Sequence, residues 1–447
     1  MRLDEIATKI GSGATPTGGA EAYLKQRNQF ALIRSQNVFD RRFDPDGLAF
    51  ISDAQASALR GVVVQPGDLL LNITGDGITF ARCCAAPEAL LPACVNQHVA
   101  IIRVDPARAH PGYVLAYLTH PQVKAYIESF NAGGSRRAIT KGHIESFRLP
   151  LPPLAEQKAI ARVLDLLDEK IIANTQMNRT LDGLARSIFG DWFLAFGPTR
   201  AMARGEKPAS IGKNLSAFFP PAFEHSPVGP IPKGWRVEPL AEHVDIERGL
   251  SYDGDGLRED GTGLPMHNLN SIYEGGGYKH DGIKFFSGTN RDKHLILPGD
   301  MIVANTEQGF DRLLIGHAAI VPARFGQRTI FSHHLYRVRP APGSPMTTHY
   351  LVQLFNSERW HYWISGFANG TTVNMLPKDA LQMPLIVIPP EELVQAFTEI
   401  AQALHQQSEA NLLESRTLDA TRDLLGPPLV SGEIGVSEQI NPSGAAH

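Results

Sequence analysis

The stretch "LPLPPLAEQKAIARVLDLLDEKI", from Leu149 to Ile171, sets the organisation of the whole chain. It begins as a short apolar segment that is broken by Pro152 and Pro153. Its apolar residues then recur every three or four positions, which is the period of an amphipathic helix. Because proline fits the first turn of a helix much better than its interior, the two prolines predict where this helix starts. A similar junction, "VIPPEELVQAFTEI", starts at Val387.

The apolar stripes of both helices are narrow and continue for about four heptads, which favours pairing in a coiled coil. The residues expected to form the seam are Ile160, Leu164, Leu167, Ile171, Asn174, Leu181, Phe397, Ile400, Leu404, Asn411 and Leu418. A buried asparagine in such a seam lowers stability but fixes the register. A helix of about 35 residues is on the order of 50 Å long, which suits a spacer. The alternative is that each helix packs only against its own domain.

The chain also repeats itself. The tripeptide PGD at 66–68 recurs at 298–300, and "NQHVAIIRV" from Asn96 matches "SHHLYRVRP" from Ser332. The matches keep their order along the chain, which indicates a duplicated unit of roughly 200 residues and not an array of short repeats. Within each copy, short β-like runs alternate with clusters of Gly, Pro, Asn and Asp and with later helical segments. The pattern predicts an α/β (α+β) fold.

The boundaries follow from these elements. We expect a first globular domain over 1–150 and a central spacer helix over 151–195. A linker at 196–225 then leads to a second globular domain over 226–388. The last parts are a C-terminal spacer helix over 389–426 and a tail over 427–447.

The composition is that of an ordinary globular protein, with 43% hydrophobic and 20% charged residues. No apolar run approaches the length of a membrane span, and the charged start "MRLDEIATKI" is not typical of a signal peptide. Three cysteines do not make a disulfide framework, so we expect a cytoplasmic location. The formal net charge of -4 argues weakly against nucleic acid, although a basic face can coexist with acidic helices.

The sequence offers no catalytic or metal site. It has no G-x-x-x-x-G-K-[ST] loop for phosphates, and "FFPPAF" at 218–223 lacks the polar residue that precedes the prolines in adenine methyltransferases. The letters E-x-K at 156–158 could suggest a nuclease, but they open the predicted helix. Cys83, Cys84, Cys94 and His98 could suggest zinc, but adjacent cysteines do not match the usual C-x₂₋₄-C spacing. Small buried thiols are the favoured interpretation.

Four segments carry a family resemblance. They are the stretch from Leu149, "NRTLDGLARSIFGDWFLAFGPTRAMARGEKP" from Asn178, "SPVGPIPKGWRVEPLAEHV" from Ser226 and "LLGPPLVSGEIGV" from Leu424. In this order they resemble the specificity (S) subunits of type I restriction-modification systems, over nearly the whole chain.

The resemblance implies two target-recognition domains and two antiparallel helices that form a coiled coil. It implies a non-catalytic subunit that binds double-stranded DNA with a bipartite target, one half-site per domain. Its expected partners are modification (methyltransferase) subunits, two in number, and a restriction (translocase and nuclease) subunit. S-adenosylmethionine, ATP and Mg are expected on those partners, and no cofactor is expected on this chain.

Polar loops near glycines are the candidate DNA contacts, because Arg, Lys, Asn, Gln, Ser and Thr bind both phosphates and base edges. In the first domain they are Arg34, Ser35, Asn37, Thr74, Arg82, Asn96, Gln97, His98, Ser135, Arg136, Arg137 and Lys141. In the second domain they are His267, Asn268, Asn270, Asn305, Gln308, Arg312, His333, His334, Thr371, Thr372, Asn374 and Lys378. For each residue the alternative is a solvated loop or an internal hydrogen bond. The loops differ between the copies, which predicts an asymmetric target.

Two other readings of the chain stay open. It could be an enzyme of methylation or restriction, or a scaffold that uses its helices for assembly without reading DNA. The aromatic patch "FGDWFLAF", from Phe189 to Phe196, is either core or an anchor for a partner.

Overall fold

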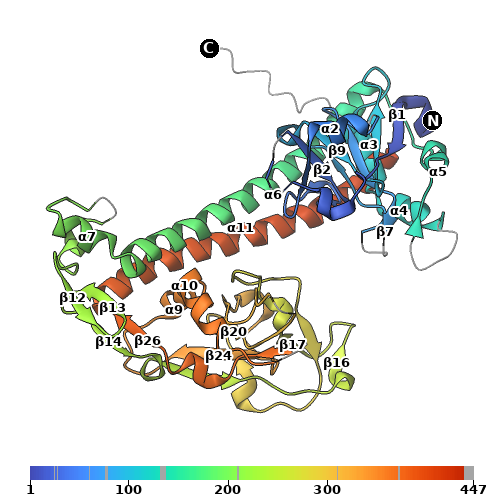
Figure 1. The fold of residues 1–447 in the computed structure, drawn as a ribbon. Coiled ribbons are helices and arrows are strands. Elements are labelled where there is room, and N and C mark those ends of the chain that lie inside the picture. The colour runs from blue at the N-terminus through green and yellow to red at the C-terminus, as the bar shows by residue number, and fades with distance from the viewer. Residues whose placement is uncertain are drawn as a thin grey trace. The chain divides into compact units, whose positions relative to one another are not determined.

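Two compact units divide the chain, and each contains part of both long helices (Figure 1). The first comprises Met1–Thr175 and Leu412–His447, and the second comprises Gln176–Asn411. This computed structural model describes residues 1–436 except 25, 28, 60, 76–78, 131–136, 209–210, 310 and 371–372.

The first unit is built on two small sheets. The antiparallel central sheet has the order β1 (Ala7–Ser12), β10 (Val99–Val104), β6 (Leu69–Asn72), β8 (Cys83–Ala85). The other sheet is β5 (Ala49–Ile51), β2 (Phe30–Ile33), β9 (Ala93–Val95), in which β2 and β9 are parallel. Two short ladders are β7 (Thr74–Gly75) with β11 (Arg137–Ala138), and β3 (Val38–Phe39) with β4 (Arg42–Phe43). The short helices are α1 (Leu3–Ile6), α2 (Asp53–Ala58), α3 (Pro111–Leu118), α4 (Pro121–Ser129) and α5 (Lys141–Ser146).

The run "VAIIRV" of β10 is apolar on both faces because both faces are covered. Ala100 and Ile102 join the core beneath α3, and Val99 and Ile101 join the core shared with the other sheet. Alternate residues of a strand point to opposite faces, so one strand serves two cores. Cys83, Cys84 and Cys94 lie in these cores as free, buried thiols, in agreement with the favoured interpretation.

The second unit repeats this topology. Its central sheet has the order β15 (Val244–Arg248), β24 (Leu335–Pro340), β20 (Met301–Ala304), β22 (Ala318–Ile320). The other sheet is β16 (Leu257–Arg258), β18 (Lys284–Phe286), β17 (Leu264–His267), β23 (Thr329–Phe331), β19 (Leu295–Ile296), with β17 and β23 parallel. The ladders are β21 (Thr306–Gln308) with β25 (Val373–Met375), β12 (Phe223–Ser226) with β13 (Gly229–Pro232), and β14 (Arg236–Pro239) with β26 (Leu385–Ile388). The short helices are α7 (Gly197–Ala203), α8 (Lys213–Ser216), α9 (Thr348–Phe355) and α10 (Glu358–Ser365). The shared strand order shows that the repeat in the sequence is a structural duplication.

The long helices α6 (Leu154–Phe189) and α11 (Glu391–Ser431) each begin directly after a pair of prolines. Gln157 fixes the first turn of α6 to its surroundings, because its side chain accepts a hydrogen bond from the His110 amide and donates one to the Pro152 carbonyl. The helix α11 runs past the expected end at 426 and through Pro427 and Pro428.

The two helices pair antiparallel within each unit. In the first unit Asp168 contacts Arg422 and Asn174 contacts Ser415, so the numbering rises on one helix as it falls on the other. In the second unit the Asn411 amide donates to Asn178 at 2.8 Å. None of the eleven expected seam residues is exposed, and the two seam asparagines retain only 3% and 7% exposure. The polar contacts are equivalent under the duplication, since Asn174 corresponds to Asn411 and Ser415 to Asn178. Buried pairs of this kind favour one register over its neighbours.

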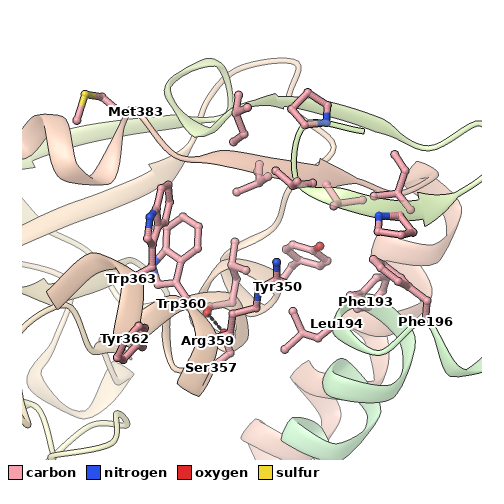
Figure 2. Close-up of a pocket in the computed structure, with 18 residues that line it drawn as sticks. Phe193, Leu194, Phe196, Tyr350, Ser357, Arg359, Trp360, Tyr362, Trp363 and Met383 are labelled. Carbon is pink, nitrogen blue, oxygen red and sulfur yellow. Dashed lines mark hydrogen bonds between the residues drawn. The ribbon is translucent and has the colours of Figure 1, made fainter. Parts of the chain in front are cut away.

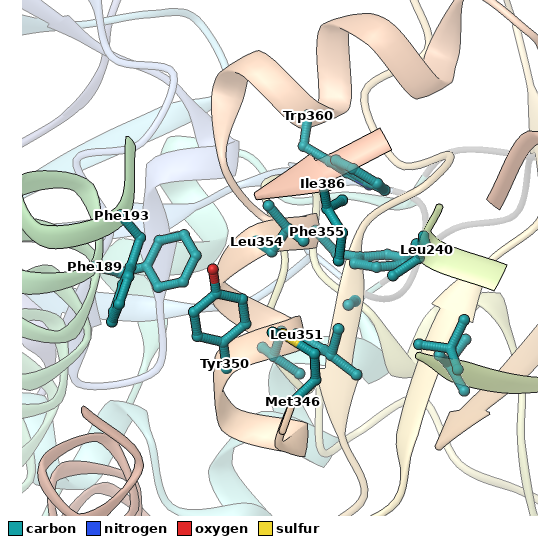
Figure 3. Close-up of a cluster of buried hydrophobic side chains, with 14 of the residues drawn as sticks. Phe189, Phe193, Leu240, Met346, Tyr350, Leu351, Leu354, Phe355, Trp360 and Ile386 are labelled. Carbon is teal, nitrogen blue, oxygen red and sulfur yellow. The ribbon is translucent and has the colours of Figure 1, made fainter. Parts of the chain in front are cut away.

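The aromatic patch after α6 is core. Phe189, Trp192, Phe193 and Phe196 are buried in the second unit, and Phe193 packs edge-on against Tyr350 (Figure 3). Burial of such large rings contributes most of the stability of a core of this kind. Phe193 and Phe196 also border an open cavity of about 560 Å³ (Figure 2).

Candidate nucleic-acid interface

A threonine and a histidine meet at the same place in both domains. Thr74 Oγ1 lies 2.6 Å from His98 Nδ1 in the first domain, and Thr306 Oγ1 lies 2.8 Å from His334 Nδ1 in the second. Each threonine begins a short ladder strand, and each histidine stands at or next to the start of a central strand. The fold thus joins two loops that the sequence identified separately.

Asn72 holds further loops of the first domain together through hydrogen bonds. It is fully buried, and its amide Nδ2 donates to the backbone oxygens of Ser35 and Thr79, both at 2.9 Å. Arg34 and Ser35, in the loop after β2, are therefore held near the strand that carries Thr74. A buried amide that is used in this way is costly to replace, because the freed carbonyls would lose their partner.

Asn305 likewise holds several segments of the second domain together through hydrogen bonds. Its Nδ2 donates to His333 O at 3.1 Å, its backbone amide donates to His334 O, and its own oxygen accepts from the Leu376 amide. The paired histidines and the segment after β25 converge on this one residue of the loop after β20.

The two ladders place different side chains on equivalent backbones. On β11, Arg137 forms an ion pair with Glu128 at 3.2 Å, and the exposed Lys141 that follows pairs with Glu145 at 3.4 Å. Exposed pairs contribute about 1 kcal/mol or less, so both cations can exchange their partner for a phosphate. On β25 the residue equivalent to Arg137 is the neutral, buried Asn374.

Fourteen of the predicted contact residues have side chains that reach the surface at least in part. They are Arg34, Ser35, Thr74, Arg82, Gln97, His98, Arg137, Lys141, Asn270, Gln308, Arg312, His333, His334 and Lys378. These side chains carry the donors and acceptors that bind phosphates and base edges.

Six predicted contact residues lie behind the surface, contrary to the expectation. They are Asn37, Asn96, His267, Asn268, Asn305 and Asn374. Each of them forms hydrogen bonds within the protein; Asn37, for example, donates to the backbone oxygens of Asp44 and Asp46 and accepts from the Arg34 amide. The structure gives these residues a supporting position instead of one that could meet DNA directly. Ser135, Arg136, Thr371 and Thr372 lie outside the described residues.

His267 shows most clearly why these six residues do not reach the surface. Its ring bonds the Tyr278 hydroxyl at 2.7 Å and the Thr329 hydroxyl at 3.1 Å, and no part of it is exposed. Burial lowers the pKa of His267 to about 3, so the ring stays neutral near pH 7. A neutral, enclosed imidazole has no attraction for phosphate.

An arginine–aspartate pair that the sequence interpretation missed recurs in both domains. Arg103 holds Asp68 through two hydrogen bonds of 2.7 and 2.8 Å, and Arg339 holds Asp300 through bonds of 2.6 and 2.5 Å. The aspartates are those of the repeated PGD tripeptides, so the repeat itself was the available signal. Each forked pair ties the turn before a central strand to the strand alongside.

Arg41 attaches the first domain to the paired helices. Its side chain is 5% exposed, and its guanidinium contacts Asp168 at 2.6 Å and Asp165 at 3.3 Å on α6. Asp168 also accepts from Arg422 of α11 at 2.7 Å, so one carboxylate joins the domain to both helices. Burial raises the pKa of Asp165, against the lowering effect of Arg41.

The second domain is attached by other chemistry. Arg186 of α6 donates to the Gly275 carbonyl at 3.2 Å, and His280 lies 3.3 Å from Glu409 of α11. The duplication therefore kept the fold but not the side chains that join it to the helices.

Among the residues that the structure describes, no helix is long and apolar enough to cross a membrane, and no group of three or more His, Cys, Asp or Glu side chains could hold a metal ion.

The model of the type I restriction modification DNA specificity domain matches residues 65–182, which run from the PGD turn into α6. The matched residues thus resemble a DNA-specificity domain. The chain is similar to the specificity subunits of type I restriction-modification systems.

Curated proteins show the same similarity. The HindI specificity subunit of Haemophilus influenzae is 22% identical over 90% of this chain and 94% of its own length. The putative MjaX specificity subunit of Methanocaldococcus jannaschii is 38% identical over 59% of this chain and 57% of its own length. The MjaIX specificity subunit of the same archaeon is 22% identical, with 66% of its length covered.

A solved structure shares the fold. The S subunit of a type I restriction-modification system from M. genitalium superimposes with a TM-score of 0.53 over 96% of this chain and 95% of its own, at 12% identity. The expected architecture of two mixed domains and paired antiparallel helices is confirmed.

Proposed function

We propose that this chain reads an asymmetric, bipartite DNA target, with one half-site bound by the surface loops of each domain. The paired helices set the length of the unspecified gap. The observation that carries the proposal is the duplicated loop scaffold, on which the first domain carries Arg137 on β11 where the second carries the buried Asn374 on β25. Equivalent backbones with different side chains recognise different base sequences.

The proposal assigns no chemistry to the chain itself. Two modification subunits methylate the target that this chain selects, and a restriction subunit carries out translocation and cleavage. S-adenosylmethionine, ATP and Mg belong to those partners. The net charge of -4 supports this division, because a chain with more acidic than basic residues gains affinity for DNA when partner subunits enclose the duplex.

An exchange of the second domain tests the proposal. Residues 226–386 are replaced by the corresponding segment of another specificity subunit, and methylated sites are mapped in cells that carry the complete system. One half of the target changes and the other half stays the same. A change in both halves, or in neither, contradicts one-domain, one-half-site reading. Methyl transfer by the purified chain alone, with S-adenosylmethionine and DNA, contradicts the non-catalytic role.

A further inference from the structure

Two arginines of the first domain lie over one aromatic ring. The guanidinium carbons of Arg42 and Arg82 are each 4.4 Å from the centroid of the Phe39 ring. All three side chains, which together form the arginine–phenylalanine stack, reach the surface at least in part. A guanidinium that stacks on a ring keeps its N–H groups in its own plane, where they remain free to bind an acceptor. The ring therefore holds two cations at the surface without using their donors.

Arg82 still lacks an acceptor. Within the part of the chain that the structure describes, it forms no hydrogen bond and no ion pair through its side chain. The carboxylate beside it is bound elsewhere, because Asp40 accepts from the Cys83 amide at 3.2 Å and pairs with Lys124. Arg82 is thus a cation that is fixed in place by stacking and keeps its charge available for an anion.

A buried residue fixes the backbone beneath the stack. The side chain of Asn72 donates from Nδ2 to the Val38 carbonyl at 3.4 Å, and its backbone amide donates to the Arg82 carbonyl at 2.8 Å. Val38 directly precedes Phe39, so one fully buried residue holds the chain on both sides of the contact between cation and ring. The geometry of the stack is therefore set before any ligand binds.

The stack lies at the same end of the central sheet as the Thr74–His98 pair. The backbone amide of Asn72 bonds the Arg82 carbonyl, and the next amide, that of Ile73, bonds the His98 carbonyl at 3.0 Å. Thr74 follows directly and begins the ladder strand β7. Arg82 thus joins the surface at which the candidate DNA contacts of the first domain gather.

The second domain keeps an aromatic residue and a cation at the equivalent place. Phe39 is the second residue after the 3₁₀ turn Ser35–Asn37. Tyr273 has the same position after the 3₁₀ turn Leu269–Ser271, and Lys279 Nζ lies 5.8 Å from the centroid of its ring. A side chain that reads bases changes with the half-site, whereas a contact to the DNA backbone suits any sequence. An arrangement that both copies keep, although their loops differ, therefore favours a backbone contact.

We propose that the arginine–phenylalanine stack binds a phosphate of the DNA backbone at the first half-site, whatever the base sequence there. Arg82 donates to the phosphate oxygens, and Phe39 and Asn72 are positioning residues. The inference rests on the proposed function, which supplies the DNA. Phosphate is favoured over a carboxylate of a partner subunit because the stack shares its end of the sheet with the ladder whose side chains differ between the domains.

DNA binding by the complex of this chain with its modification subunits tests the proposal. The probe is a labelled duplex that carries the target found by mapping methylated sites, and anisotropy gives its affinity at several salt concentrations. Arg82→Ala lowers the affinity about tenfold at ~0.1 M salt and reduces the slope of log K against log salt by about 0.9, because one phosphate contact is lost. Arg82→Lys keeps the slope, and Phe39→Leu weakens binding only about threefold.

The matched control is Arg108→Ala. Arg108 is an exposed arginine of the same domain that lies beyond the other end of β10 from His98. Its replacement changes neither the affinity nor the salt slope. If Arg82→Ala binds DNA as this control does, the proposal is overturned.

A second measurement alters the DNA instead of the protein. Neutral methylphosphonates replace the phosphates of the first half-site one at a time. At one position the original complex loses about tenfold in affinity, and the Arg82→Ala complex loses nothing further there. Full affinity of the original complex at every position, or equal losses for both complexes at every position, overturns the proposal.

Two other outcomes would assign Arg82 a different partner. A change in the preferred base of the target would make Arg82 a base reader. Weaker assembly of the Arg82→Ala chain with modification subunits, measured without DNA, would identify a protein carboxylate as its partner. Either outcome overturns the proposal. If the original complex does not prefer its own target over unrelated DNA, it is the proposed function that fails.

Discussion

Duplication of two facing heptads tests the spacer role of the helices. Residues 169–175 of α6 lie opposite 414–420 of α11, as the Lys170–Glu414 ion pair at 3.0 Å and the Asn174–Ser415 bond show. Repeating both segments in one variant keeps every seam position and copies these contacts. A change in one helix alone would instead move one half of the seam out of register.

The magnitude follows from helix geometry. Seven residues add about 10.5 Å, at 1.5 Å each, and rotate the helix by only about 20° from whole turns. At 3.4 Å per base pair this length equals about three base pairs of DNA. We therefore expect the preferred gap between half-sites to grow by about three base pairs, with both half-site sequences unchanged.

The assay is a mapping of methylated sites in cells, with a library of gap lengths between the two half-sites. As a control, seven residues are inserted after Gly205, in an exposed turn outside the long helices, and this insertion leaves the preferred gap unchanged. Retention of the original gap by the heptad variant, with efficient methylation, would refute the reasoning.

Three further predictions concern single contacts. Replacing Arg41 with alanine deprives the nearly buried Asp168 of one partner and lowers the free energy of unfolding of the first unit by about 3 kcal/mol in urea denaturation. A decrease below about 0.5 kcal/mol contradicts the view that Arg41 attaches the domain to the helices. Charge reversal at Arg137 and Lys141 lowers the affinity of the assembled complex for its DNA target by about tenfold at ~0.1 M salt and leaves assembly intact. If the variant complex binds its target as tightly as the original one, these residues do not contact DNA. His267 is held neutral in the folded state but takes up a proton in the unfolded chain below about pH 6.5. The free energy of unfolding therefore falls as the pH drops from about 6.5 towards the folded pKa of about 3, by up to about 1.4 kcal/mol per pH unit. The variant His267→Gln makes this slope shallower, and an unchanged slope between pH 6 and 4 contradicts the assignment.

The elements whose apolar residues or segments recur at regular intervals could be predicted from the sequence. The seam of α6 and α11 was visible because its three-four spacing is set by the helix itself, and the shared sheet order was visible as repeated segments. The end of α11 was not predicted, because Pro427 and Pro428 signal a stop. Leu429 and Val430 are buried in the core of the first unit, and this burial compensates for the hydrogen bonds that the prolines cannot make.

The surface was harder to predict than the scaffold. Loop composition could not separate His98, which is partly exposed, from His267, which is enclosed, because the direction of a side chain depends on neighbours far away in the sequence. Arg41 and Asp168 are 127 residues apart, and nothing local to either residue indicates the contact. The boundaries of the globular domains stay predictions, and so do the residues that would read bases.

Mapping of methylated adenines across the genome of cells that carry the complete system tests the central claim most directly. The account predicts one target made of two short, dissimilar half-sites, separated by a gap of fixed length and any sequence. A single contiguous site, or two identical inverted half-sites, would contradict a duplicated reader whose two copies present different side chains.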